Sequence, residues 1–126
     1  MKLFLALIFM SSLVFAATGS KTTKRADPCE VAKIKEQEIG LITENISNIN
    51  TTNTETGGPY QRKVMKCKGA NCQVLAETKT VKKYMPDHID ADSEGYVQFP
   101  KIDANAEMSN LLRASAEFES AKIRCN

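Results

Sequence analysis

An apolar stripe with helical spacing follows Asp27-Pro28. It steps by three, four and three residues through Ile39, Ile42, Ile46 and Ile49. Lys, Glu and Gln fill most of the positions between them, which is typical of an amphipathic helix with one buried face. Asp27 suits the N-cap and Pro28 suits the first helical position. We therefore predict a helix over residues 29–49.

A second stripe with the same kind of spacing lies at the end of the chain. Its members, at alternating steps of three and four, are Met108, Leu111, Ser115, Phe118, Lys122 and Cys125. Asp103 precedes this stripe and suits the N-cap of a helix. An amphipathic helix cannot bury its stripe alone. We therefore expect the two helices to pack against each other as an antiparallel pair.

The segment between the two helices has the character of β structure. Residues 50–59 are polar and rich in turn-forming residues, which predicts a loop. Segments 60–68 and 72–85 predict the two arms of a β-hairpin, joined by a short turn. Residues 95–99 alternate like a short strand that stops at Pro100. The predicted fold class is α+β, with two terminal amphipathic helices and a small antiparallel β region between them.

The first residues have the pattern of a secretory signal peptide. Lys2 is followed by an apolar run over residues 3–17, with small residues at its end. A membrane-spanning helix needs roughly 20 apolar residues, so this run is short for one, and an uncleaved anchor is the alternative. We predict a signal peptide over 1–17, a disordered leader over 18–26 and one domain over 27–126, with no stable membrane span after cleavage.

Four cysteines lie in the predicted exported domain, where an oxidising compartment favours disulfides. Cys67 and Cys72 flank the predicted hairpin turn, so neighbouring strands would bring them together. Cys29 is near the start of the first helix and Cys125 is near the end of the last. These two ends meet if the helices are antiparallel. We predict the pairs Cys67–Cys72 and Cys29–Cys125.

Composition narrows the classes of function. Seventeen Lys and Arg against fifteen Asp and Glu give a net charge of +2, which gives no electrostatic case for nucleic acid. The absence of Trp disfavours a large aromatic ligand pocket, and a single His leaves little for a His-based active site. We therefore expect a non-enzymatic protein with no small-molecule substrate and no cofactor.

The acidic run from Asp87 to Gly95 has some features of a metal site. Counted from Asp90, an EF-hand loop would place oxygen ligands at Asp90, Asp92 and Glu94, but its twelfth position is Lys101 where a bidentate Glu is needed. His88 has no second His to share a zinc ion. A loop turn explains the run better, and we expect no metal.

Three segments carry a family resemblance. The first contains Asn45, Asn48 and Thr51, followed by Gly57, Gly58, Pro59 and Tyr60. The second contains His88, Asp90, Asp92, Gly95 and Tyr96. The third contains Glu107, Met108, Ser115 and Phe118. In this order the three segments resemble motifs of flagellar basal-body rod proteins, specifically the FlgC family. The first is similar to Asn-x-Ala-Asn-x-x-Thr-Thr followed by Gly-Gly-Pro-Tyr. The second is similar to His-Pro-Asp-Ala-Asp-x-x-Gly-Tyr-Val, and the third to the segment from Glu-Met to Ala-Ser-Arg-x-Tyr-Glu.

This resemblance implies a structural protein whose terminal helices pack in a helical tube, with rod components as protein partners. Members of the family generally lack cysteines and a cleaved signal peptide. We therefore expect a secreted, cysteine-containing and shortened relative in the periplasm, associated with the basal body of the bacterial flagellum. Its expected interaction surfaces are residues 45–52 and 87–96. The alternative is a small secreted binding module, held by disulfides and unrelated to flagella.

Overall fold

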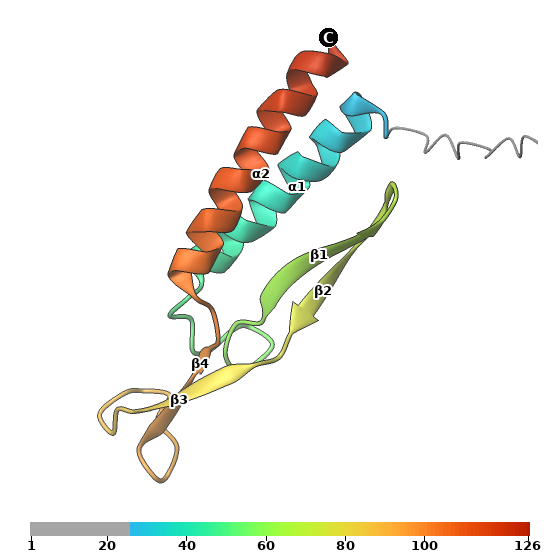
Figure 1. The fold of residues 1–126 in the computed structure, drawn as a ribbon. Coiled ribbons are helices and arrows are strands. Elements are labelled where there is room, and N and C mark those ends of the chain that lie inside the picture. The colour runs from blue at the N-terminus through green and yellow to red at the C-terminus, as the bar shows by residue number, and fades with distance from the viewer. Residues whose placement is uncertain (1–25) are drawn as a thin grey trace, which may run out of the picture.

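The computed structural model describes residues 26–126, and these form two helices and four strands (Figure 1). In chain order the elements are α1 (Pro28–Ser47), β1 (Arg62–Lys68), β2 (Asn71–Glu77), β3 (Thr80–Tyr84), β4 (Tyr96–Pro100) and α2 (Ala104–Cys125). The predicted α+β class is confirmed. The signal peptide predicted over 1–17 lies outside the described residues, as does the predicted leader except for Ala26.

Both helices begin at the predicted N-caps. The Asp27 side chain accepts a hydrogen bond from the Cys29 N–H at 3.0 Å, and Pro28 opens α1. The Asp103 side chain accepts from the N–H groups of Asn105 and Ala106, at 2.9 and 3.1 Å. These side chains satisfy amide groups that have no partner inside the first helical turn. Local sequence alone therefore sets where each helix starts.

The two helices lie side by side and antiparallel, as predicted (Figure 1). Their contact is built from small residues, since Ala32, Ala114 and Ala121 are all buried, and these allow the backbones to approach closely. A disulfide joins Cys29 at the start of α1 to Cys125 at the end of α2, with Cα atoms 4.7 Å apart. This pair therefore forms as the sequence predicts.

The buried face of α2 differs from the predicted stripe. Its buried residues are Glu107, Ala114 and Ala121, spaced by seven residues, which places them on one line along the helix. Met108 was expected in the buried stripe but is 48% exposed, and Lys122 is also exposed. Close packing against α1 instead buries Glu107, Ala114 and Ala121, each one position before the predicted Met108, Ser115 and Lys122.

The β region consists of two separate two-stranded antiparallel sheets, β1–β2 and β3–β4. Cys67 lies opposite Cys72 at the end of the first hairpin, and the two form the predicted disulfide. The single arm predicted over residues 72–85 is wrong, because the chain leaves the first sheet after Glu77. It pairs again as β3 with β4, whose Val97 and Phe99 are buried. That pairing joins segments distant in sequence, so the local pattern did not reveal it.

The two sheets occupy different places relative to the helix pair. The β1–β2 hairpin runs alongside α1, whereas β3–β4 extends from the end of the helix pair where α1 ends and α2 begins (Figure 1). No helix within residues 26–126 is long and apolar enough to cross a membrane. α1, α2 and β1 meet where α1 ends and α2 begins.

Candidate functional site

A buried polar cluster occupies this junction, and Asn45 of α1 is at its centre. The Asn45 side chain is 1% exposed. Its Oδ1 accepts from the Lys63 N–H at 2.8 Å and from the Tyr60 hydroxyl at 3.0 Å. Its Nδ2 donates to the Lys63 carbonyl at 2.8 Å and to Glu107 Oε2 at 3.3 Å. The amide thus uses its full hydrogen-bonding capacity and binds the backbone of β1 as a neighbouring strand would.

Glu107 of α2 supplies the charge of the cluster. Its side chain is also 1% exposed, and a buried carboxylate is costly unless it is paired. Arg62 Nε donates to Glu107 Oε1 at 2.7 Å, and Arg62 Nη1 lies 3.0 Å from Glu77 Oε2 of β2. Burial lowers the pKa of Arg62, but its hydrogen bonds to Glu107 and Glu77 outweigh burial and raise it. The guanidinium therefore stays charged between two carboxylates.

Tyr60 completes the cluster from the loop that leads into β1. Burial, followed by the negative charges of Glu44 and Glu107, raises the pKa of Tyr60 from 10.0 to about 12. Between pH 10 and 12 the folded protein then holds this proton more tightly than the unfolded chain does. The contribution of this proton to stability is complete below pH 10 and is lost as the pH rises toward 12.

We expect an ultraviolet titration of phenolate formation in the folded protein to show one tyrosine that ionises near pH 12. A difference titration between the wild type and Tyr60→Phe assigns it, because the variant lacks this transition alone. Tyr60→Phe also removes the hydrogen bond to Asn45 and should cost about 1 kcal/mol of stability at neutral pH. A difference titration with a midpoint at pH 10 would contradict this environment for Tyr60.

The end of α1 is built by the neighbouring motif residues. Asn48 Nδ2 donates to the Glu44 carbonyl at 2.9 Å, and the Thr51 hydroxyl donates to Asn48 Oδ1 at 2.9 Å. The Tyr60 N–H then donates to the Thr51 carbonyl at 3.0 Å, which closes the loop that precedes β1. Gly57 and Gly58 turn this loop with φ angles of +87° and +72°. Asn48 and Thr51 thus position Tyr60 inside the cluster.

The second motif segment folds as a turn-rich loop held against residues 51–53. Asp90 Oδ2 accepts from the Thr52 hydroxyl at 2.6 Å, and His88 Nδ1 accepts from the Asp90 N–H at 3.1 Å. Asp92 Oδ1 accepts from the N–H groups of Glu94 and Tyr96, at 3.0 and 2.8 Å. These carboxylates are engaged in shaping the loop. Within residues 26–126, no group of three or more His, Cys, Asp and Glu side chains is arranged to hold a metal ion.

Gly95 closes this loop under tight steric limits. Its φ is +83°, and a Cβ added there would lie 2.8 Å from the Tyr84 ring. The Met85 N–H donates to the Gly95 carbonyl at 2.9 Å at the end of the β3–β4 hairpin. The glycine is therefore required by both backbone conformation and space, which gives a physical reason for its place in the motif.

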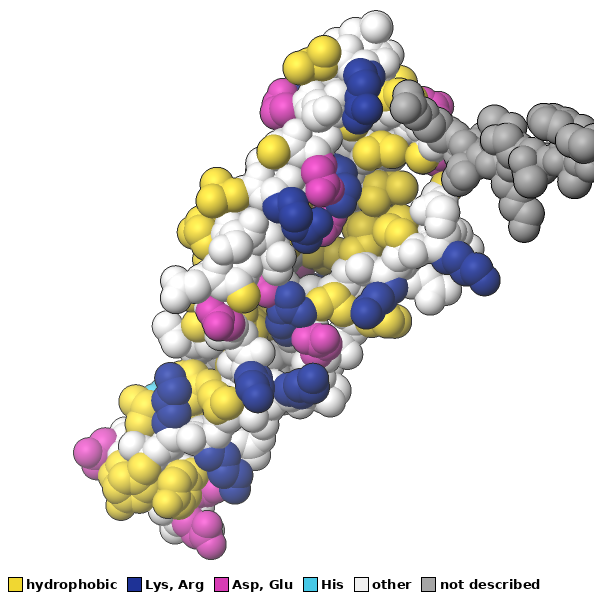
Figure 2. All heavy atoms as spheres, in the orientation of Figure 1, with side chains coloured by type: hydrophobic (Ala, Val, Ile, Leu, Met, Phe, Trp, Pro, Cys, Tyr) yellow, Lys and Arg dark blue, Asp and Glu magenta, His cyan; other side chains and the backbone are white. Residues whose placement is uncertain are grey.

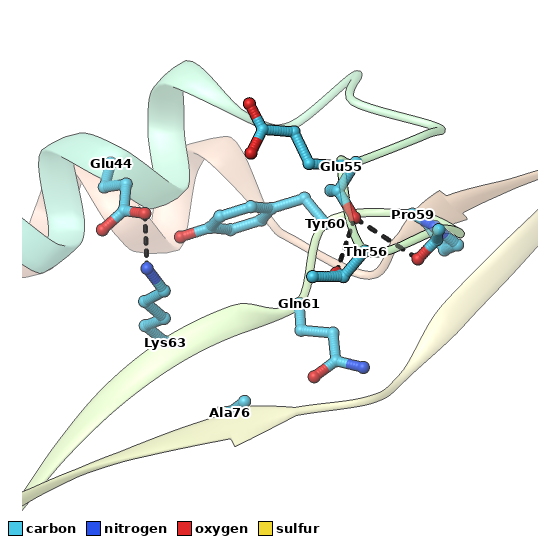
Figure 3. Close-up of a pocket in the computed structure, with 10 residues that line it drawn as sticks. Glu44, Glu55, Thr56, Pro59, Tyr60, Gln61, Lys63 and Ala76 are labelled. Atoms are coloured by element: carbon cyan, nitrogen blue, oxygen red, sulfur yellow. Dashed lines mark hydrogen bonds and ion pairs between the residues drawn. The ribbon is translucent and has the colours of Figure 1, made fainter.

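A pocket of about 410 Å³ opens beside the cluster, between α1, the loop and the β1–β2 hairpin (Figure 3). Glu44 and Lys63 face each other across it, with Lys63 Nζ 2.6 Å from Glu44 Oε1 (Figure 3). The Tyr60 ring lies between the helix and the strand, and its hydroxyl is already bonded to Asn45. The ion pair between Glu44 and Lys63 thus holds α1 against β1 at this pocket.

The structure brings some predicted motif residues together and leaves others apart. Asn45, Tyr60 and Glu107 meet in the cluster, although they come from different parts of the sequence. Met108 is half exposed, and Ser115 and Phe118 lie partly buried along α2, away from the cluster. Pro59 lines the pocket beside it.

Lys63 and Glu77 belong to the cluster although no motif marks them, whereas Arg62 closes the first rod-like motif segment. Arg62 follows Tyr60 by two residues, so its position beside the cluster has a local signal. Glu77 is the register partner of Arg62 in the β1–β2 hairpin. The pair could therefore have been found by counting back from the turn between Cys67 and Cys72. Lys63 binds the Asn45 side chain through its backbone N–H and carbonyl groups. Because the side chain of Lys63 takes no part in these bonds, its residue type gives no sequence signal.

No protein-family model matches the chain. The chain is similar to a flagellar rod protein. This relative is the flagellar basal-body rod protein FlgC of Borreliella burgdorferi. The two sequences are 26% identical over an alignment 111 positions long, which covers 65% of this chain and 73% of the relative. The similarity is distant, and it supports at most a relationship to the flagellar rod family.

Proposed function

We propose that this protein is a non-enzymatic structural protein of the flagellar rod type, which acts by binding other proteins at the basal body. One observation carries the proposal: residues of the first and third rod-like motifs meet in one buried cluster. Asn45, Tyr60 and Glu107 each contribute a buried polar group to it. The distant similarity to FlgC of Borreliella burgdorferi supports the same conclusion.

The proposed role of the cluster is to fix the relative positions of the helix pair and the hairpin. Asn45 binds the backbone of β1, and Glu107 of α2 binds Arg62 of the same strand. Neither helix can shift along β1 without leaving buried polar groups unpaired, which is costly. A subunit that presents fixed surfaces to neighbouring proteins requires this kind of rigidity. We place those surfaces at residues 45–52 and 87–96, with rod components as partners.

We also propose that the protein works after export to the periplasm, with residues 1–17 removed as a signal peptide and residues 18–26 as a leader to the single domain 27–126. The two disulfides support an oxidising compartment, because such bonds persist there and are rare where glutathione and thioredoxin keep thiols reduced. Rod proteins of the FlgC type lack such cysteines, so the disulfides would be an adaptation of this relative.

The test is a gene deletion in the native bacterium, complemented with a tagged copy. We expect the deletion to reduce swimming, and we expect the tagged protein to co-purify with flagellar rod components from the periplasmic fraction. Mass spectrometry of the purified protein should show a chain that begins at Ala17 or Thr18. A complementing copy with Asp90→Ala, which disturbs the proposed 87–96 surface, should restore swimming less well than the wild type.

Normal swimming together with the absence of any co-purifying flagellar protein would overturn the flagellar role and favour the unrelated secreted binding module. A purified chain that still carries Met1 would overturn the proposed export by cleavage. The two outcomes are independent, so one experiment separates the function from the route of export.

A further inference from the structure

The charges of this protein are unevenly distributed, although its overall net charge is only +2. Residues 62–84, which include β1, β2 and β3, contain seven Lys and Arg against one Glu, a net charge of +6. The loop over residues 85–95 contains four Asp and Glu and no Lys or Arg. Lys79, Lys82 and Lys83 lie next to this loop, and Arg62 and Lys63 are paired with Glu107 and Glu44. Of the basic side chains of residues 62–84, those that lie away from the loop and have no carboxylate partner among the described residues are Lys66 and Lys68 near the tip of the β1–β2 hairpin (Figure 1), and they allow one copy to attract another.

Among residues 26–126, the most exposed large apolar side chain also lies on the acidic loop. Ile89 is 94% exposed and lies between Asp87 and Asp90. Figure 2 shows hydrophobic side chains gathered at this end of the molecule, with acidic side chains beside them. The hydrogen bonds of Asp90 to Thr52 and of Asp92 to Tyr96 hold the loop in shape. Ile89 is therefore presented on a preformed support, which lowers the entropy cost of binding.

A groove with an apolar floor lies between the helix pair and the β1–β2 hairpin. Figure 2 shows it as a recess lined by hydrophobic side chains. A pocket of about 180 Å³ within it is lined by Leu41 and Ile42 of α1 and by Val64 of β1. Leu75 pairs with Val64 across the hairpin, so it shares the face of Val64, and it is 45% exposed. The groove thus offers apolar surface that the described fold leaves partly uncovered.

The rim of this groove is basic. Lys66 and Lys68 lie on the same hairpin face as Val64 and Leu75, since strand residues two apart share a face, and both are exposed. Arg113 of α2 also lines the pocket, but it already pairs with Glu38 at 3.7 Å and with Glu117 at 3.5 Å, so the available positive charge of the rim comes from Lys66 and Lys68. The one acidic residue of the lining, Glu38, already lies 2.7 Å from Lys35. The rim therefore favours an acidic partner with an apolar centre.

We infer that the partner of this groove is a second copy of the chain, whose acidic loop 86–94 enters it with Ile89 against Val64 and Leu75. The carboxylates on either side of Ile89 then face Lys66 and Lys68. The loop and the groove are different surfaces, so the contact is head-to-tail and can repeat from copy to copy. This inference does not depend on the flagellar role, because it concerns the association of the purified protein with itself.

The test is sedimentation velocity of the oxidised, exported protein over a range of concentrations. We expect reversible association that weakens when the ionic strength rises from about 0.05 M to about 0.5 M, because the contact pairs opposite charges. Ile89→Lys in the loop and Leu75→Glu in the groove should each raise the Kd for association at least about tenfold, as for loss of a central apolar anchor. Both residues are exposed in the monomer, so both variants should fold.

Mixing the two variants gives the sharpest outcome. Ile89→Lys retains an intact groove and Leu75→Glu retains an intact loop, so the mixture should form a one-to-one complex that grows no further. The matched control is Ile123→Lys, because Ile123 of α2 is 74% exposed and does not line the groove. It replaces an exposed apolar residue outside the proposed contact, and the variant should associate as the wild type does.

A wild-type protein that stays monomeric at all concentrations would overturn the inference. So would association that is lost in Ile123→Lys but retained in Ile89→Lys. A mixture of Ile89→Lys and Leu75→Glu that forms no complex would also overturn it. A monomer in which Leu75→Cys resists a thiol reagent would also overturn it, since the groove would then be filled by the chain's own N-terminal segment. None of these results bears on swimming or on co-purification with rod components.

Discussion

Replacing Cys29 and Cys125 together with serine should lower the free energy of unfolding of the oxidised protein by about 4–5 kcal/mol. The disulfide joins residues separated by 96 positions, so it removes a large loop-closure entropy from the unfolded chain. Total stabilities of small domains are on the order of 5–15 kcal/mol, so the loss would be a large part of the whole. Urea unfolding of the variant and the wild type, both free of reductant, measures the difference.

The second disulfide provides the matched control. Cys67 and Cys72 are separated by five positions, so the same argument gives about 2 kcal/mol for Cys67→Ser with Cys72→Ser. The long-range pair should therefore matter about twice as much as the short-range pair. Equal losses in the two double variants, or an unchanged urea midpoint for Cys29→Ser with Cys125→Ser, would show that the helix ends are held by packing instead.

Removal of the Glu107 carboxylate has the second large effect. We expect Glu107→Ala to lower the free energy of unfolding by about 3 kcal/mol, because breaking a buried ion pair leaves the remaining charge poorly compensated. This loss is at the lower end of the usual range for a broken buried ion pair, because Arg62 keeps its contact with Glu77 and the Arg62 side chain is partly exposed. Asn45 also loses the acceptor for one of its amide hydrogens. Thermal and urea unfolding at neutral pH measure this loss.

A double-mutant cycle tests whether the broken ion pair with Arg62 causes this loss of stability. Glu107→Leu combined with Arg62→Met replaces both charges by apolar groups, which is often much less damaging than removing one partner. We expect the double variant to be more stable than Glu107→Leu alone. Glu119→Ala is the control, because Glu119 is an exposed carboxylate on the same helix. If the effects of the two replacements simply add, Glu107 and Arg62 are not energetically coupled and the cluster does not hold the fold as described.

Electrostatic contacts between the helices make a smaller contribution. Lys35 Nζ of α1 lies 2.6 Å from Glu117 Oε2 of α2. The hydrogen bond from Lys35, opposed by burial, lowers the pKa of Glu117. A lowered carboxyl pKa contributes stability that is present above the ordinary pKa of Glu and is lost as the pH falls through the lowered value. Since Glu117 is substantially exposed, this contact belongs with the weak surface pairs.

The features that could be predicted from the sequence depend on residues close together along the chain. The caps Asp27 and Asp103 start their helices because their side chains bond to amide groups two or three positions ahead. The apolar spacing predicted two helices, and antiparallel packing then placed Cys29 beside Cys125. The turn between Cys67 and Cys72 likewise fixed the second disulfide.

The features that could not be predicted depend on partners far apart in the sequence. The buried line of α2 is set by how closely α1 approaches, which favours Ala114 and Ala121 over Ser115 and Lys122 of the predicted stripe. The break after Glu77 arises because β3 pairs with β4, which follows a long loop. Local periodicity reports which residues are apolar, but the choice of neighbour depends on packing across the whole chain.

The buried cluster shows both kinds of information together. The family-like motifs marked Asn45, Tyr60 and Glu107 as residues of interest, but no spacing along the chain indicated that the three would touch. Their meeting depends on the antiparallel packing of α1 and α2 and on the place of β1 beside them, which together enclose a carboxylate and an amide away from water. The sequence therefore carries the elements, their caps and the cysteine pairs, whereas the packing of distant elements creates the cluster and the groove.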